Sequence, residues 1–222
     1  MRRRFLCRTA LAAVAVLGLA SLVFAASPGT VTTTGAFDDP AASAGLKSAL
    51  EDNGHRLALY DGSVVEIWLR KSAPTSKEKD PSAVYSQFGR SAFVGVIRFS
   101  RQAKDFRGQL IKPGAYGMRY ELLPSDGNHM GCAAQPDFVL LTPLALDVDP
   151  GANYDFGRLV EMSGKASGTG HPASLSLVPT EEASRFPSLF YTSDGFVAFA
   201  AKIGAGSSGF PFALVVKGVA QQ

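Results

Sequence analysis

Apolar and polar residues alternate in short runs along most of the chain, a pattern that indicates β-strands with one buried face. The clearest run follows the turn residues Pro113-Gly114. In it, four apolar side chains share one predicted inner face and two charged side chains the outer one: Tyr116, Met118, Tyr120 and Leu122 against Arg119 and Glu121. The segment 92–99 is almost continuously apolar, which indicates a strand buried on both faces.

Turn residues join several of these runs into hairpins. Asp61-Gly62, a pair suited to a tight turn that needs positive φ, separates the runs 56–60 and 64–70. Asp194-Gly195 separates two later runs in the same way. Further strands are expected at 30–33, 137–141, 173–178, 189–192, 196–203 and 210–217.

Two segments have the period of helices instead. Asp39-Pro40 supplies a cap and a first-turn proline, and Asn53-Gly54 supplies a stop, so a helix is expected between them. The segment 153–166 places apolar side chains on one face and is followed by Gly168, a typical helix terminator.

Many short strands with only two helices favour a mainly β protein over a parallel α/β fold. No internal repeat and no long linker divides the sequence. We therefore predict a single antiparallel β-sandwich of about eight or nine strands, with two short peripheral helices, over residues 26–222.

The first 25 residues have the pattern of a secretory signal peptide. Arginines in the first eight residues form a positive region, 10–20 is apolar, and Val23-Phe24-Ala25 provides the small residues that a signal peptidase recognises. Cleavage is expected after Ala25, with export to the periplasm or the extracellular space. Arg2-Arg3-Arg4-Phe5-Leu6 also resembles a twin-arginine export signal. An uncleaved N-terminal membrane anchor over 10–26 is the remaining alternative.

Removal of this leader would change the formal net charge of the chain, which is +3 for all 222 residues. The whole chain has 22 Lys and Arg against 19 Asp and Glu. Four of the cations are Arg2, Arg3, Arg4 and Arg8, so the remainder has 18 positive against 19 negative groups and a formal charge of −1. A basic surface for nucleic acid is therefore not supported, and contact with a membrane is expected only through an uncleaved leader.

Candidate chemistry lies mainly in the polar loop predicted at 124–136, before the strand 137–141. His129, Met130 and Cys132 would supply imidazole, thioether and thiolate, which suit copper or zinc, with His171 as a further ligand. Asp126 and Asn128 are additional loop candidates. Alternatively, the two histidines and Asn128 only hydrogen-bond to loop backbone, and Cys132 is a buried apolar residue.

Three motifs are similar to those of a group of uncharacterised exported bacterial proteins. They are the strand 111–120 with its proline-glycine-x-tyrosine core, the run 126–131 (DGNHMG) and the run 167–172 (SGTGHP), and the likeness spans most of residues 26–222. The resemblance implies a β-sandwich-like domain and export. It implies no activity and transfers no functional residue.

These patterns favour an exported, non-catalytic binding or envelope-associated domain without a cofactor. Its partner would be a small molecule, a glycan or an envelope protein. The alternative is a periplasmic copper- or zinc-binding protein that uses His129 and its neighbours. A hydrolase is the third hypothesis, although the chain has no G-x-S-x-G motif.

Overall fold

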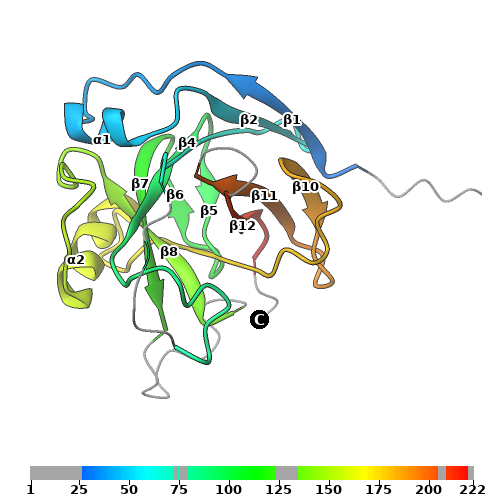
Figure 1. Cartoon of the computed structure of the whole chain (residues 1–222). Helices are drawn as coiled ribbons and strands as arrows, with labels where there is room; N and C mark the ends of the chain where they lie inside the picture. The colour runs from blue at the N-terminus through cyan, green and yellow to red at the C-terminus, as the bar shows by residue number, and fades with distance from the viewer. Residues whose placement is uncertain (1–26, 73–74, 76–79, 124–134, 205–208, 220–222) are drawn as a thin grey trace, which may run out of the picture.

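The computed structural model describes residues 27–72, 75, 80–123, 135–204 and 209–219. Strands dominate this part of the chain, which contains twelve of them and two helices (Figure 1). The strands are β1 (Gly29–Thr34), β2 (Gly54–Leu59), β3 (Val64–Leu69), β4 (Phe93–Phe99), β5 (Ala103–Lys104), β6 (Leu110–Ile111), β7 (Gly114–Leu122), β8 (Asp137–Pro143), β9 (Ser174–Ser176), β10 (Ser188–Tyr191), β11 (Val197–Ile203) and β12 (Phe210–Lys217). The helices are α1 (Ala44–Ala49) and α2 (Phe156–Ser167).

All strand pairs are antiparallel. One sheet has seven strands in the order β1-β2-β3-β4-β7-β8-β9, and a second has the order β10-β11-β12. The predicted mainly β, antiparallel, sandwich-like fold is confirmed. The strand count exceeds the expected eight or nine partly because β5 and β6, of two residues each, form a small ribbon of their own.

The two sheets enclose one large apolar core. Alternate residues of β2, β3, β4 and β7 point inward from the large sheet, and those of β11 and β12 from the small one. Ile67, Met118, Phe199 and Phe212 are completely buried in this cluster. The continuous shared core follows from the alternation that was visible in the sequence.

The edges of the two sheets lie against each other. β10 contacts β1 (Figure 1), and β12 contacts β9. At the second junction Leu177 and Leu214 form a bridge, and the Val178 N–H donates to the Ala213 carbonyl at 3.1 Å. The Tyr85 hydroxyl strengthens this junction, because it donates to the Val178 carbonyl at 2.6 Å and accepts from the Ala213 N–H at 3.0 Å.

The first helix starts later than predicted. Asp39 closes a turn, since its carboxylate accepts from the Ala41 N–H and its carbonyl accepts from the Ala42 N–H. Ser43 is the actual cap and accepts from the Leu46 N–H. The helix does not continue to Asn53-Gly54, because its C-cap Leu50 forms an antiparallel bridge with Arg70, the residue after β3. The second helix agrees better with its prediction. Asp155 caps it, and Gly168, the expected terminator, ends it with a φ of 70°.

The outer face of β7 is covered, contrary to the expectation for its charged residues. Arg119 is 0% exposed and Glu121 1% exposed. All five N–H groups of the Arg119 guanidinium are used, two of them on the Asp147 carboxylate and the rest on the carbonyls of Ser91, Asp149 and Ala152. This network fastens the connection after β8 to the sheet.

Two apolar layers complete the covering of the large sheet. α1 and the segment before it pack over Trp68 and Phe93, while α2 packs over Phe138 and Leu140. Neither of the described helices has the length and apolar character needed to cross a membrane.

Candidate functional site

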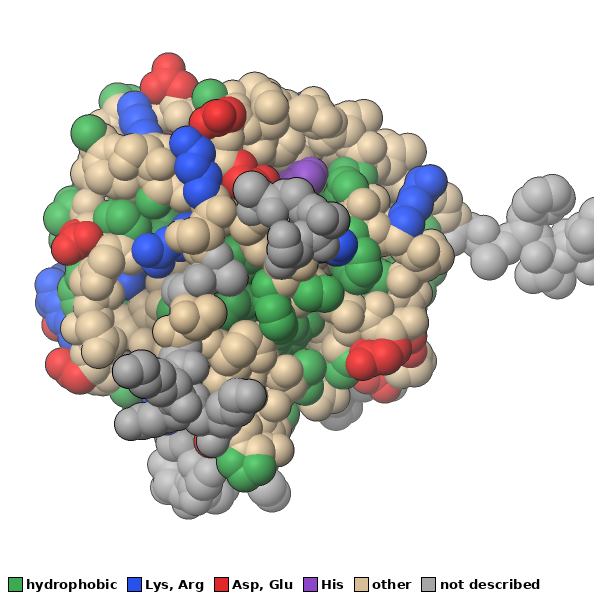
Figure 2. Space-filling model, viewed as in Figure 1, with side chains coloured by type: hydrophobic (Ala, Val, Ile, Leu, Met, Phe, Trp, Pro, Cys, Tyr) green, Lys and Arg blue, Asp and Glu red, His purple; other side chains and the backbone are tan. Residues whose placement is uncertain are grey.

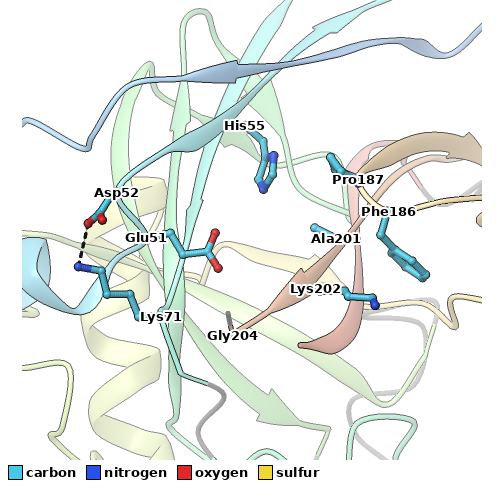
Figure 3. A pocket seen from close by; sticks show the side chains of 9 residues that line it. All are labelled: Glu51, Asp52, His55, Lys71, Phe186, Pro187, Ala201, Lys202 and Gly204. Carbon is cyan, nitrogen blue, oxygen red and sulfur yellow. Dashed lines mark ion pairs between the residues drawn. The ribbon is translucent and has the colours of Figure 1, made fainter. Parts of the chain in front are cut away.

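A pocket of about 540 Å³ opens at one end of the space between the two sheets (Figure 3). One side is formed by the residues that lead into β2 and follow β3, and the other by those that precede β10 and by the end of β11. The residues that line it are Glu51, Asp52, His55, Lys71, Phe186, Pro187, Ala201, Lys202 and Gly204. On the face shown in Figure 2, a histidine lies beside acidic and hydrophobic side chains.

His55 occupies an inward position of β2, in register with the buried Leu57 and Leu59. Its ring packs against Phe199 of the small sheet, with 5.2 Å between the ring centroids. Burial lowers the pKa of His55 below its ordinary value, so the imidazole is neutral at pH 7. Its ring nitrogens have no hydrogen-bond partner within the described part of the chain, which leaves a donor and an acceptor for a ligand.

Glu51 is the second polar group of this pocket. Its backbone N–H donates to the Leu69 carbonyl at 2.9 Å, which fixes it beside the end of β3. The side chain points into the space between the sheets (Figure 3). Burial raises the pKa of Glu51, and the nearby charge of Asp52 raises it further.

The nearest cation of the same sheet does not neutralise Glu51. Lys71 forms an ion pair with Asp52 at 2.9 Å (Figure 3). Both of these side chains are largely exposed, so the pair contributes little to stability. Among the residues that the structure describes, the Glu51 carboxylate has neither an ion pair nor a hydrogen bond, a costly situation for a half-buried charge.

The opposite wall is more apolar. Phe186 and Pro187 lie where the chain enters β10, and Ala201 is buried on β11. Lys202 stands at the lip next to Ala201 (Figure 3). The pocket thus combines a carboxylate and a neutral imidazole with an aromatic and aliphatic wall. Such a surface binds small molecules that have a donor or cationic group on one side and an apolar face on the other.

The metal site predicted from the sequence lies mostly outside the described residues: Asp126, Asn128, His129, Met130 and Cys132 all fall there. Of the predicted ligands the structure places only His171, which is exposed. Its backbone N–H donates to the Thr169 hydroxyl and its carbonyl accepts from the Ser167 hydroxyl. No group of three His, Cys, Asp or Glu side chains capable of holding a metal occurs among the described residues. Copper or zinc binding stays a prediction.

Sequence reasoning did not assign a role to His55 or Glu51. One signal was available for His55, because the alternation of Arg56 and Ala58 with Leu57 and Leu59 places residue 55 on the apolar face. A histidine on an apolar face is costly to bury without a hydrogen-bond partner, so such a position is a candidate for a functional role. The predicted strand began at 56 and so missed it.

The comparisons with known proteins identify no relative. The chain matches no protein-family model, and neither the curated proteins nor the solved structures show a significant match.

Proposed function

We propose that this protein is an exported, non-catalytic binding domain that holds a small molecule in the pocket lined by Glu51 and His55. The unpaired, half-buried Glu51 carboxylate is the observation that carries the proposal. A protein stabilises a charge of this kind best by a partner, and here the space in front of it is open (Figure 3).

The dimensions of the pocket support a small ligand over a glycan chain or an envelope protein. Its volume of about 540 Å³ lies within the usual range for small-molecule sites. The ligand would place a cation or an N–H or O–H donor against Glu51 and accept or donate a hydrogen bond at His55. Its apolar face would contact Phe186 and Pro187.

A thermal-shift screen tests the binding function. The panel contains agmatine, cadaverine, lysine, glucose and glutamate at pH 7. A ligand that binds only the native state raises the Tm. We expect the amines to raise it for the unaltered protein, with a shift at least halved in Glu51→Gln and His55→Gln.

Two exposed positions provide matched controls. Glu161 on α2 forms ion pairs with its helix neighbours Arg158 and Lys165 and does not line the pocket, so Glu161→Gln keeps the pocket intact. His171→Gln removes an exposed imidazole. Equal shifts in Glu51→Gln and Glu161→Gln, or no shift with any compound, would refute the proposal.

Export is supported by the leader pattern of residues 1–25. Expression of the complete chain in a Gram-negative host should yield periplasmic protein whose first residue is Ala26. Replacement of Arg2 and Arg3 by lysine distinguishes the twin-arginine route, since only that route requires the arginine pair. An intact N-terminus in the membrane fraction would instead establish the anchored alternative.

A further inference from the structure

A second pocket, of about 400 Å³, opens at the opposite end of the sandwich. The first pocket lies at the start of β2 and the end of β11, whereas this one lies at the end of β2 and the start of β11. The β4–β5 connection and the end of β12 complete its walls. The two pockets therefore share no lining residue.

The floor of the second pocket is the end of the apolar core. Five buried side chains, one from each of five strands, contribute to it: Leu59, Val65, Phe99, Val197 and Val216. A ligand in this pocket would place its apolar part directly against core residues, which favours a hydrocarbon over a polar molecule.

The mouth of the pocket carries a surplus of positive charge. Lys217 is paired with Asp61, and the Lys217 hydrogen bond holds the pKa of Asp61 well below its ordinary value. Arg101 and Lys104 also line the pocket, and neither forms an ion pair with any described residue. Three cations thus face one carboxylate here, although residues 26–222 as a whole have a formal charge of −1.

Exposed apolar side chains gather at the same end. Tyr60 is 58% exposed, and its ring lies 6.5 Å from that of Tyr191, which is 39% exposed. Val219, also exposed, lines the pocket. Half of the six large exposed hydrophobic residues in the described part of the chain are at this rim. A gathering of this kind marks a binding surface more often than chance exposure does.

We propose that the second pocket binds an amphipathic anion, namely a carboxylate with an unbranched hydrocarbon tail. The tail lies against Val65, Phe99 and Val216, and the carboxylate lies between Arg101 and Lys104. Arg101 can bind a carboxylate through two parallel N–H groups, while Lys104 contributes a point charge. The proposal is independent of the first pocket and of its ligand.

Isothermal titration calorimetry with decanoate tests this assignment directly. The exported protein should bind one decanoate with a Kd in the micromolar range, and the affinity should fall as NaCl is added because the head-group contacts are exposed. Decanol lacks the charge and butyrate lacks the tail, so each should bind at least tenfold more weakly. Decyltrimethylammonium reverses the charge and should not compete.

Variants locate the site. The double change Arg101→Gln and Lys104→Gln should weaken decanoate at least tenfold, whereas Arg158→Gln with Lys165→Gln, an exposed pair on α2, should leave the Kd within twofold. Ala103→Phe places a ring in the pocket and should also weaken binding. Equal Tm values for the unaltered protein and the two charge variants would show that they are folded.

Four results would overturn the proposal. Three of them are equal affinity for decanol and decanoate, an unchanged decanoate Kd in the Arg101 and Lys104 double variant, and loss of decanoate binding in Glu51→Gln, which would move the ligand to the first pocket. Absence of saturable binding below about 1 mM would also reject it.

Discussion

At the scale of single residues, Glu51 and His55 both have pKa values shifted by burial. Burial opposes the charge of each group: it raises the pKa of Glu51 and lowers the pKa of His55. Burial of a titratable group lowers the stability of the free protein, and such groups are common at functional sites. Glu51 and His55 both line the first pocket and fit this description.

His55 should make stability depend on pH in a defined direction. As the pH falls through about 6.5, the unfolded chain takes up a proton at His55, but the folded protein, with its lowered pKa, does not. Stability therefore falls in this window. Urea denaturation at pH values from about 5 to 8 should show a shallower decline in His55→Gln than in the unaltered protein, and parallel curves would contradict the burial of this group.

Glu51 should make stability depend on pH in the opposite direction to His55. Its pKa is raised in the folded protein, so ionisation above this value costs the native state stability. We expect Glu51→Gln to be more stable than the unaltered protein at pH 7, because the amide carries no charge that burial opposes. The advantage should vanish below about pH 4.5, where the carboxyl is protonated in both states. A destabilised Glu51→Gln at pH 7 would indicate a structural partner for this carboxylate.

At the scale of elements, the junction between β9 and β12 depends on a side chain from a loop. Asp137 at the start of β8 accepts hydrogen bonds from the Val84 and Tyr85 backbone N–H groups and from the Tyr120 hydroxyl. These bonds place Tyr85 so that its hydroxyl spans the two sheets. The loop between β3 and β4, which carries Tyr85, thus determines how the two sheets meet.

Tyr85→Phe should destabilise the protein by about 1–3 kcal/mol, because it leaves a buried N–H and a buried carbonyl without the hydroxyl. Tyr60→Phe is the control, since Tyr60 is exposed and its hydroxyl lies outside the core. Urea denaturation measures both. Equal midpoints for the two variants would show that the hydroxyl contributes nothing to this junction.

The sequence predicted most elements and missed their exact ends. Strand 210–217 was placed without error because its apolar run is almost continuous and ends at Lys217, as in a strand buried on both faces. The helix at 44–49 was misplaced because Asp39 and Ser43 are both good caps, and Ser43 also donates to the Val148 carbonyl across the fold. Only that tertiary contact distinguishes the two caps.

At the scale of the whole molecule, both sheets contribute to one core, so they should unfold together. Phe199 and Phe212 of the small sheet lie in the same cluster as Ile67 and Met118 of the large one. Calorimetry should show a single transition with equal calorimetric and van't Hoff enthalpies. Two resolved transitions would mean that the small sheet is an independent unit.

Local patterns could have placed His55 on the apolar face of its strand, but they could not have predicted the candidate site as a whole. Glu51 and His55 meet Phe186 and Ala201 only because β2 and β11 face each other across the core, although they are far apart in the sequence. Residue alternation indicates which side chains point inward, but not which strand lies opposite. The sequence pointed to histidine-bearing loops, whereas the described site lies at the open end of the core.

The meeting of the sheet edges has a consequence for association with neighbouring chains. A free edge strand offers unpaired N–H and C=O groups to any neighbouring chain and is a common start of aggregation. Here β1 lies against β10, and β9 is bridged to β12, so each sheet covers edges of the other. The same contacts that complete the core therefore also hinder the addition of a strand from another molecule at these edges.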